Sequence, residues 1–155
     1  MAKSPFTYSQ LKESDLNTID ELRKLFPRWK RKSLIKKLKE TFNGKDFRFV
    51  AQKKEKIIAH LMYRQGEDKH EHRAEMSSLI VLEKERRNGV ASALIKYSLK
   101  RLPKKVSLVL LAVDKKNNPA LALYKKLGFK KYGYLEKASF IEGKYVNNYL
   151  LKKEI

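Results

Sequence analysis

The sequence predicts a mixed α/β (α+β) fold, with about seven strands and about four helices in a single domain over residues 1–155. Two stretches, Ser77–Leu102 and Val106–Phe129, each consist of an apolar strand, a polar connection and an amphipathic helix. The residues that follow alternate as two further strands. The chain contains neither a linker rich in proline and glycine nor an internal repeat, so we expect no second domain.

The amino-acid composition excludes several classes of protein and of functional site. The absence of cysteine excludes disulfides, thiolate zinc sites and a cysteine nucleophile. Apolar runs stay well short of the ~20 residues that a membrane span needs, and the first ten residues lack the apolar segment of a signal peptide. We therefore expect a soluble, cytoplasmic protein with no membrane contact.

The net charge of +20 concentrates anions around the protein. Such a potential favours nucleic acid, a ribosome, an acidic protein surface or a cosubstrate with several phosphates. The alternative is a set of solvated lysines without a specific partner, because the lysines are spread along the whole chain. Both interpretations stay open at this point.

The first elements are a short strand, Phe6–Leu11, and a helix that opens at Ser14–Asp15 and ends at Pro27. A second helix from about Lys30 to Phe42 places Leu34, Ile35 and Leu38 on its inward face. Its outward face is basic and is a candidate surface for an acidic partner, or simply a solvated face. The basic residues are Lys30, Arg31, Lys32, Lys36, Lys37 and Lys39.

A turn at Asn43–Gly44 precedes two strands, Asp46–Gln52 and Lys56–Tyr63, which a polar hairpin loop connects. His60 lies inside the second strand, so we expect it to be packed or hydrogen-bonded rather than catalytic. The loop 65–73 that follows carries two more histidines, but their spacing matches no strong metal motif. We interpret that loop as structural or as a rim of a substrate mouth, and we predict no metal site.

The stretch Ser77–Leu102 contains the strongest candidate for an anion site. The first turn of a helix leaves backbone N–H groups unpaired, and these groups favour phosphate. Gly89 lets the chain turn sharply out of the strand and lets a ligand approach the backbone, and Ala91 keeps that approach open. Arg86 and Arg87 add permanent positive charge that suits a diphosphate.

The stretch Val106–Phe129 begins with a very apolar strand, Val106–Val113. We expect its helix to have Asn118 as N-cap, Pro119 at the first helical position and Gly128 just past the end. Two strands then follow, Tyr132–Phe140 and Tyr145–Lys152, around a turn at 141–144. The predicted order of elements is β-α-α-β-β-β-α-β-α-β-β.

Taken together, the two stretches resemble the GNAT N-acetyltransferase superfamily. The family pattern Q/R-x-x-G-x-G/A, which binds the pyrophosphate of acetyl-CoA, corresponds to Arg86–Ala91, and its later block corresponds to Asn117, Tyr124 and Phe129. The resemblance implies the GNAT fold, a mixed and mostly antiparallel sheet whose two middle strands splay apart to seat the pantetheine arm. It also implies acetyl-CoA as cosubstrate.

The resemblance further implies roles for individual residues. Tyr124 would be the general acid and Glu75 the general base, acting directly or through a water. Other family members place a carboxylate where this chain has Ala112, which rules out that version of the mechanism and leaves Asp114 as a reserve candidate. A backbone N–H near Val81 would meet the oxyanion. The expected cosubstrate-binding residues are Leu79, Ile80, Val81, Arg86, Arg87, Asn88, Gly89, Val90, Ala91, Ser92, Asn117 and Tyr124.

The implied function is transfer of the acetyl group of acetyl-CoA to a primary amine by direct attack in a ternary complex. The acceptor would be a protein N-terminus, a lysine or a small-molecule amine, and the protein a monomer or homodimer. The alternative is a non-catalytic CoA-binding GNAT module that binds RNA or a ribosome through its basic surface. The uncertain base favours the alternative, and Tyr124 favours an enzyme.

Overall fold

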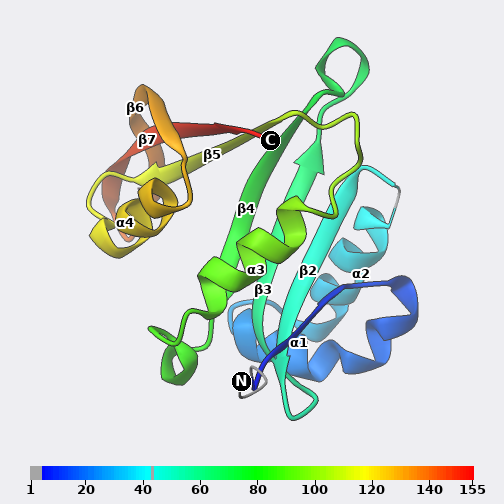
Figure 1. Ribbon diagram of the computed structural model, residues 1–155. Helices are drawn as coiled ribbons and strands as arrows, with labels where there is room; N and C mark the ends of the chain where they lie inside the picture. Colours follow the sequence, from blue (N-terminus) through cyan, green and yellow to red (C-terminus); the bar gives the residue numbers. More distant parts are fainter. Residues whose placement is uncertain (1–4, 43) are drawn as a thin grey trace. The chain divides into compact units, whose positions relative to one another are not determined.

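The computed structural model describes residues 5–42 and 44–155 (Figure 1). Asn43, the first residue of the predicted turn, lies outside these residues. Within them the chain forms seven strands and four α-helices in the predicted order. The strands are β1 (Thr7–Gln10), β2 (Asp46–Lys53), β3 (Lys56–Gln65), β4 (Arg73–Val81), β5 (Leu108–Asp114), β6 (Lys130–Ile141) and β7 (Lys144–Glu154). The helices are α1 (Ile19–Leu25), α2 (Arg31–Thr41), α3 (Val90–Leu99) and α4 (Asn118–Lys126).

The strands hydrogen-bond in the order β1-β2-β3-β4-β5-β7-β6. The pairs β1/β2, β2/β3, β5/β7 and β6/β7 are antiparallel, whereas β4 and β5 are parallel. The α/β class and the mostly antiparallel sheet are therefore confirmed. The register of β4 against β5 joins Arg73–Glu75 to Leu108–Leu110, and β4 then continues to Val81.

The chain forms two compact units, and β4 contributes to both. Unit 1 contains the described residues up to Arg64 together with Ser78–Pro103, and unit 2 contains Gln65–Ser77 together with Lys104–Ile155. In the described residues, no helix combines the length and the apolar character that crossing a membrane requires.

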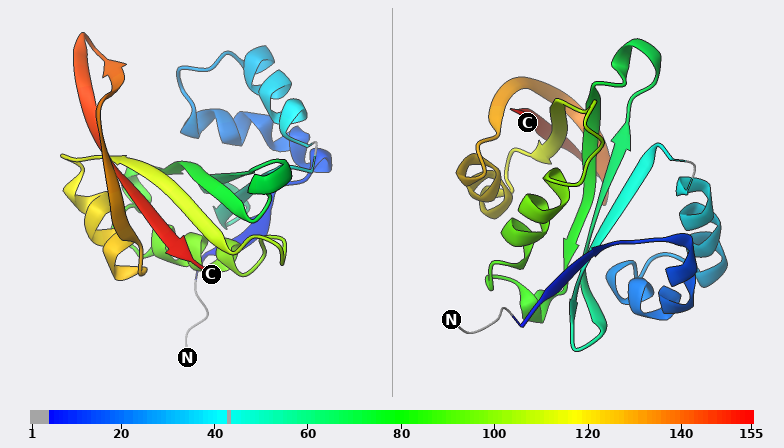
Figure 2. Two further views of the ribbon diagram at one scale, coloured as in Figure 1. Left: turned by 90° about the horizontal axis from the view of Figure 1, so that it is seen from above. Right: turned by 45° about the vertical axis from the view of Figure 1, so that its right-hand side comes forward.

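In unit 1 the strands bury both faces, since successive side chains of a strand point to opposite sides. Val50 faces α1 and α2, whereas its neighbour Phe49 packs edge-on against Tyr63 and Tyr97 on the α3 side. Figure 2 shows α1 and α2 on one side of these strands and α3 on the other. The core on the α1 and α2 side consists of Leu11, Ile19, Leu22, Leu25, Leu34, Leu38, Val50 and Ile57.

The first predicted helix is divided. Glu13–Thr18 forms a 3-10 helix, and α1 begins only at Ile19. Asp15 accepts a hydrogen bond from the Lys12 N–H at 2.8 Å, so this short polar side chain caps the 3-10 turn from within it. As predicted, the helix ends before Pro27.

Helix α4 in unit 2 begins one residue differently from the prediction. The N-cap is Asn117 rather than Asn118, because the Asn117 Oδ1 accepts the N–H of Ala120, the third residue of the helix, at 3.2 Å. At the other end Gly128 has φ +85°, and its N–H donates to the Lys125 carbonyl at 3.0 Å. The Phe129 N–H donates to the Tyr124 carbonyl at 3.0 Å, so the predicted glycine after the helix is confirmed as part of a Schellman motif.

His60 is buried and hydrogen-bonded, as expected, with 0% of its surface exposed. Its Nε2 lies 3.0 Å from Arg48 Nη1, its Nδ1 lies 3.1 Å from the Ser78 carbonyl oxygen, and Phe26 packs edge-on against its ring. Burial, and then the positive charge of Arg48, lower the pKa of His60 from 6.5 to about 3. The folded protein therefore keeps this imidazole neutral.

The lowered pKa of His60 predicts acid sensitivity. Below pH 6.5 the unfolded chain binds a proton that folded His60 does not, until the pH reaches about 3. The free energy of unfolding should therefore fall by about 1.4 kcal/mol per pH unit from this group as the pH drops through that range. Denaturant unfolding of the wild type and of His60→Gln at several pH values measures the difference, and equal slopes would contradict the prediction.

Candidate functional site

The elbow between β4 and α3 lies in unit 1 and has the expected glycine geometry. Gly89 is the N-cap of α3 with φ +76° and ψ 0°, a left-handed conformation that favours glycine. No atom lies within 4 Å of the position that a Cβ would occupy there, so the backbone is open to a ligand. The helix ladder starts with the Ala93 N–H donating to the Gly89 carbonyl at 3.0 Å, and no side chain caps the helix. The N–H groups of Val90, Ala91 and Ser92 precede that ladder.

Positive charge surrounds these N–H groups. Arg86, Arg87 and Asn88 are exposed, and the Arg86 Nε donates to the Val81 carbonyl at 3.1 Å, which ties the side chain to the end of β4. Arg87 also has a positive φ, +63°. The elbow therefore presents backbone donors and guanidinium groups together, the combination that binds phosphate.

A partly buried ion pair beside the elbow is a feature that sequence reasoning missed. Glu85 is 7% exposed, and Lys53 Nζ donates to its two carboxylate oxygens at 3.2 and 2.9 Å. The pair neutralises a carboxylate that would otherwise repel an anion at the elbow. Because Lys53 lies 32 positions before Glu85, no local pattern connects the two residues.

The predicted pantetheine-binding residues at the end of β4 are half-buried. Leu79, Ile80 and Val81 each expose part of their surface, and Ile80 packs against the core next to α1 and α2. Ser78 precedes them with φ +53°, so β4 carries a local irregularity at this point. The backbone of this segment, rather than its side chains, is what a ligand amide would contact.

Glu75 is an exposed residue of β4 in unit 2, opposite Leu110 in the parallel register with β5. Ala112, on β5, is exposed, and its methyl side chain can neither donate nor accept a proton. The carboxylate of Asp114 accepts the Lys116 N–H at 2.9 Å and so supports the turn after β5. Asp114 therefore has a structural role in a turn, whereas Glu75 lies within a strand.

Tyr124 combines a buried ring with an accessible hydroxyl. The residue is 7% exposed, its ring packs edge-on against Phe129 at 5.6 Å, and burial raises the pKa of its hydroxyl. Among the described residues the hydroxyl has no hydrogen-bond partner, whereas every buried side-chain oxygen and nitrogen has one. The Tyr124 oxygen therefore reaches the surface and is available to a ligand.

Asn117 caps α4, and its side chain is also predicted to contact the cosubstrate. Its Oδ1 accepts the cap hydrogen bond of α4, which leaves the amide Nδ2 and the second lone pair of Oδ1 for contacts with a cosubstrate. The predicted residues from Leu79 to Ser92 lie in unit 1, whereas Glu75, Asn117 and Tyr124 lie in unit 2.

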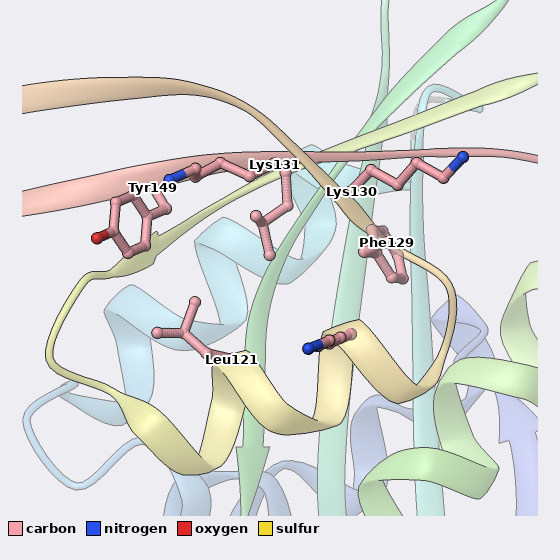
Figure 3. Close-up of a pocket in the computed structure, with 7 residues that line it drawn as sticks. Leu121, Phe129, Lys130, Lys131 and Tyr149 are labelled. Atoms are coloured by element: carbon pink, nitrogen blue, oxygen red, sulfur yellow. The ribbon is translucent and has the colours of Figure 1, made fainter.

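A separate pocket of about 390 Å³ lies between α4 and the strands β6 and β7 in unit 2 (Figure 3). Leu121 and Phe129 contribute apolar surface, and Lys131 lies with its Nζ 4.4 Å from the centre of the Tyr149 ring. None of the predicted site residues lines this pocket. In the part of the chain that the structure describes, His, Asp and Glu form no group of three or more that could hold a metal ion.

Comparisons with solved structures identify the fold. An acetyltransferase of the GNAT family from Streptococcus pneumoniae superposes with a TM-score of 0.82 at 18% identity, covering 97% of this chain and 99% of that one. A ribosomal-protein-alanine N-acetyltransferase from Brucella melitensis gives 0.82 at 15% identity over 96% and 99%. A spermidine N-acetyltransferase chimera from Vibrio cholerae gives 0.82 at 24% identity over 97% and 96%. At these identities the likeness establishes the fold alone.

A search of curated proteins finds no match. The model of the acetyltransferase (GNAT) family matches residues 16–129, which include β2 to β5, the elbow, α3 and α4. The family pattern at the elbow and the block that ends at Phe129 both fall inside this range. The chain therefore belongs to the acetyltransferase (GNAT) family.

Proposed function

We propose that this protein is an acetyl-CoA-dependent N-acetyltransferase that acetylates a primary amine by direct attack. The observation that carries the proposal is the uncapped N-terminus of α3, which opens at a left-handed glycine with two arginines beside it. The N–H groups of Val90, Ala91 and Ser92 would bind the pyrophosphate of CoA, and Arg86 and Arg87 would neutralise its charge.

In the proposed reaction the acceptor nitrogen attacks the thioester carbonyl carbon, a C–N bond forms and the C–S bond breaks. An amine with a pKa near ~10.4 is protonated at neutral pH, so Glu75 would take its proton directly or through a water. A backbone N–H near Val81 would stabilise the oxyanion. Tyr124 would then protonate the departing thiolate.

The environment of Tyr124 supports its role as a proton donor. Burial raises the pKa of the hydroxyl and keeps it protonated, and the hydroxyl has no partner among the described residues that would compete for its proton. A phenol is a weak acid, so it gives up its proton only as negative charge develops on the sulfur. That is the stage at which the leaving thiolate needs it.

The acceptor would be a protein N-terminus, a lysine or a small-molecule amine. One structural neighbour is named for the alanine of a ribosomal protein and another for spermidine. Basic residues on α2 are exposed, and Lys37 lies over the Trp29 ring at 5.4 Å. This surface would attract an acidic macromolecular partner and repel a polyamine.

Acetyl-CoA turnover against a panel of peptides, lysine and small amines tests the proposal directly. We expect CoA release that depends on one class of amine. CoA binding with no turnover on any acceptor, together with salt-dependent retention of RNA, would favour the alternative of a non-catalytic module.

Gly89→Glu should weaken CoA binding by about 100-fold or more, because it strains a left-handed position and adds a negative charge next to the phosphates. Isothermal titration calorimetry with CoA measures the loss. Gly89→Asn is the matched control, since asparagine tolerates this backbone conformation and carries no charge. Unchanged affinity in Gly89→Glu would reject the elbow as the phosphate site.

Tyr124→Phe should lower kcat by about 10²-fold and leave the melting temperature nearly unchanged, because the hydroxyl donates to no described residue. Steady-state kinetics and thermal unfolding measure the two effects. Tyr132→Phe, at a tyrosine that is 50% exposed, provides the control. A wild-type kcat would leave Tyr124 with a packing role only.

Glu75→Gln should remove the acidic limb of the pH profile of kcat/KM, since a neutral amide accepts no proton. Asp114→Asn provides the comparison because that carboxylate is the reserve candidate for the base. The prediction fails if Glu75→Gln keeps the wild-type profile, and a profile altered only in Asp114→Asn would transfer the role to Asp114.

A further inference from the structure

Ser78 occupies a backbone conformation that needs support. Its φ is +53°, in a region that residues with a side chain rarely adopt. Such a conformation persists only where the surrounding structure holds it. Ser78 directly precedes Leu79, Ile80 and Val81, which are expected to bind the cosubstrate, and the proposed function places the N–H donor for the oxyanion near Val81.

The contact that holds Ser78 comes from His60. The His60 Nδ1 lies 3.1 Å from the Ser78 carbonyl oxygen, and the opposite ring nitrogen lies 3.0 Å from Arg48 Nη1. A carbonyl oxygen only accepts hydrogen bonds, and a guanidinium only donates them. One tautomer satisfies both neighbours, with the proton on Nδ1 and the lone pair on Nε2.

This tautomer is fixed by its surroundings. His60 is 0% exposed, Arg48 is 7% exposed, and the Phe26 ring packs edge-on at 5.0 Å from the imidazole. Protonation of Nε2 would place a second cation against Arg48 in a buried site. Burial, and then the positive charge of Arg48, lower the pKa of His60, so the imidazole is neutral at physiological pH. Asp46 and Arg64 are the charged groups that act on Arg48.

The peptide plane transmits the hydrogen bond to the site. The Ser78 carbonyl and the Leu79 N–H belong to the same planar trans peptide unit, in which they point in opposite directions. A hydrogen bond that fixes the carbonyl toward His60 therefore fixes the Leu79 N–H away from it. A ligand carbonyl on that side would therefore meet a donor that is already oriented.

We propose that His60 is a positioning residue, which orients the Leu79 N–H toward a thioester or amide carbonyl by holding the Ser78 carbonyl, with Arg48 fixing its tautomer. The inference rests on the proposed function for the identity of that ligand. His60 itself touches neither the substrate nor the reacting atoms.

Two substitutions separate the two hydrogen bonds of His60. The amide nitrogen of Asn matches the position of Nδ1 and keeps the donor to Ser78, but it leaves Arg48 without its acceptor. The longer Gln matches the position of Nε2 and keeps the acceptor for Arg48, but it loses the donor to Ser78. Kinetics with acetyl-CoA and binding of adenosine 3′,5′-bisphosphate as a probe of the elbow are measured for both variants. The ¹⁵N chemical shift of the Leu79 amide is also measured, because it responds to the hydrogen bond that the Ser78 carbonyl of the same peptide unit accepts.

We expect His60→Gln to lower kcat by about tenfold, with the affinity for the bisphosphate within about twofold of wild type, and to shift the Leu79 amide resonance away from its wild-type position. His60→Asn should retain kcat within about twofold and keep the wild-type Leu79 shift. Equal losses in the two variants would reduce His60 to a packing residue and overturn the proposal, as would wild-type behaviour in both.

The chemical-shift measurement needs no ligand, so it decides the positioning role even if the wild type shows no turnover. Absent turnover, together with a wild-type Leu79 shift in His60→Asn and an altered shift in His60→Gln, would reject the proposed function but not the role of His60. If His60→Gln does not fold, His60→Asn decides alone, because its amide retains only the contact with Ser78. An altered Leu79 shift in that variant would overturn the proposal.

Discussion

The backbone at the start of α3 sets the chemistry that the rest of the molecule supports. A helix must leave its first N–H groups without partners inside the helix, and here no side chain caps them. The left-handed Gly89 lets the connection that follows β4 turn into that helix, and it leaves open the space where a Cβ would stand. The arginines beside it supply positive charge. The hydrogen-bond donors are backbone N–H groups, which do not depend on the identity of the side chains.

The surroundings of the elbow maintain that arrangement. Lys53 neutralises the buried Glu85, and Arg86 is tied to the last carbonyl of β4. The hydrophobic contacts of Ile80 and Leu82 attach the same segment to the core beside α1 and α2. A backbone site is as precise as the segments that hold it, so these contacts determine how well the donors are oriented.

In the proposed function, unit 2 uses a different principle, because its functional group would be a side chain. The Schellman motif at Gly128 ends α4 and brings Phe129 against the Tyr124 ring. Burial of the ring fixes its orientation, whereas the hydroxyl is left to the surface. A tyrosine in this position would contribute reactivity without a supporting hydrogen bond, in contrast to the doubly bonded His60 of unit 1.

The local sequence pattern predicted the strands, the helices and the glycines at helix ends. Strand alternation, helix caps and left-handed turns depend on residues close together in the chain. The same kind of information located the elbow and Tyr124. It misplaced the α4 cap by one residue and joined a 3-10 helix to α1, since adjacent asparagines and short polar side chains offer several equivalent local hydrogen bonds.

Only the tertiary structure decided which distant residues meet. Lys53 pairs with Glu85, and His60 lies between Arg48 and the Ser78 carbonyl, with the three residues on separate strands. The depressed pKa of His60 follows from burial and from the charge of Arg48, neither of which is written in the residues next to it. Sequence alone thus determined the chemistry of the elbow, because backbone N–H groups and a glycine are local features. The fold decided how that chemistry is held, because holding it requires contacts between segments far apart in the chain.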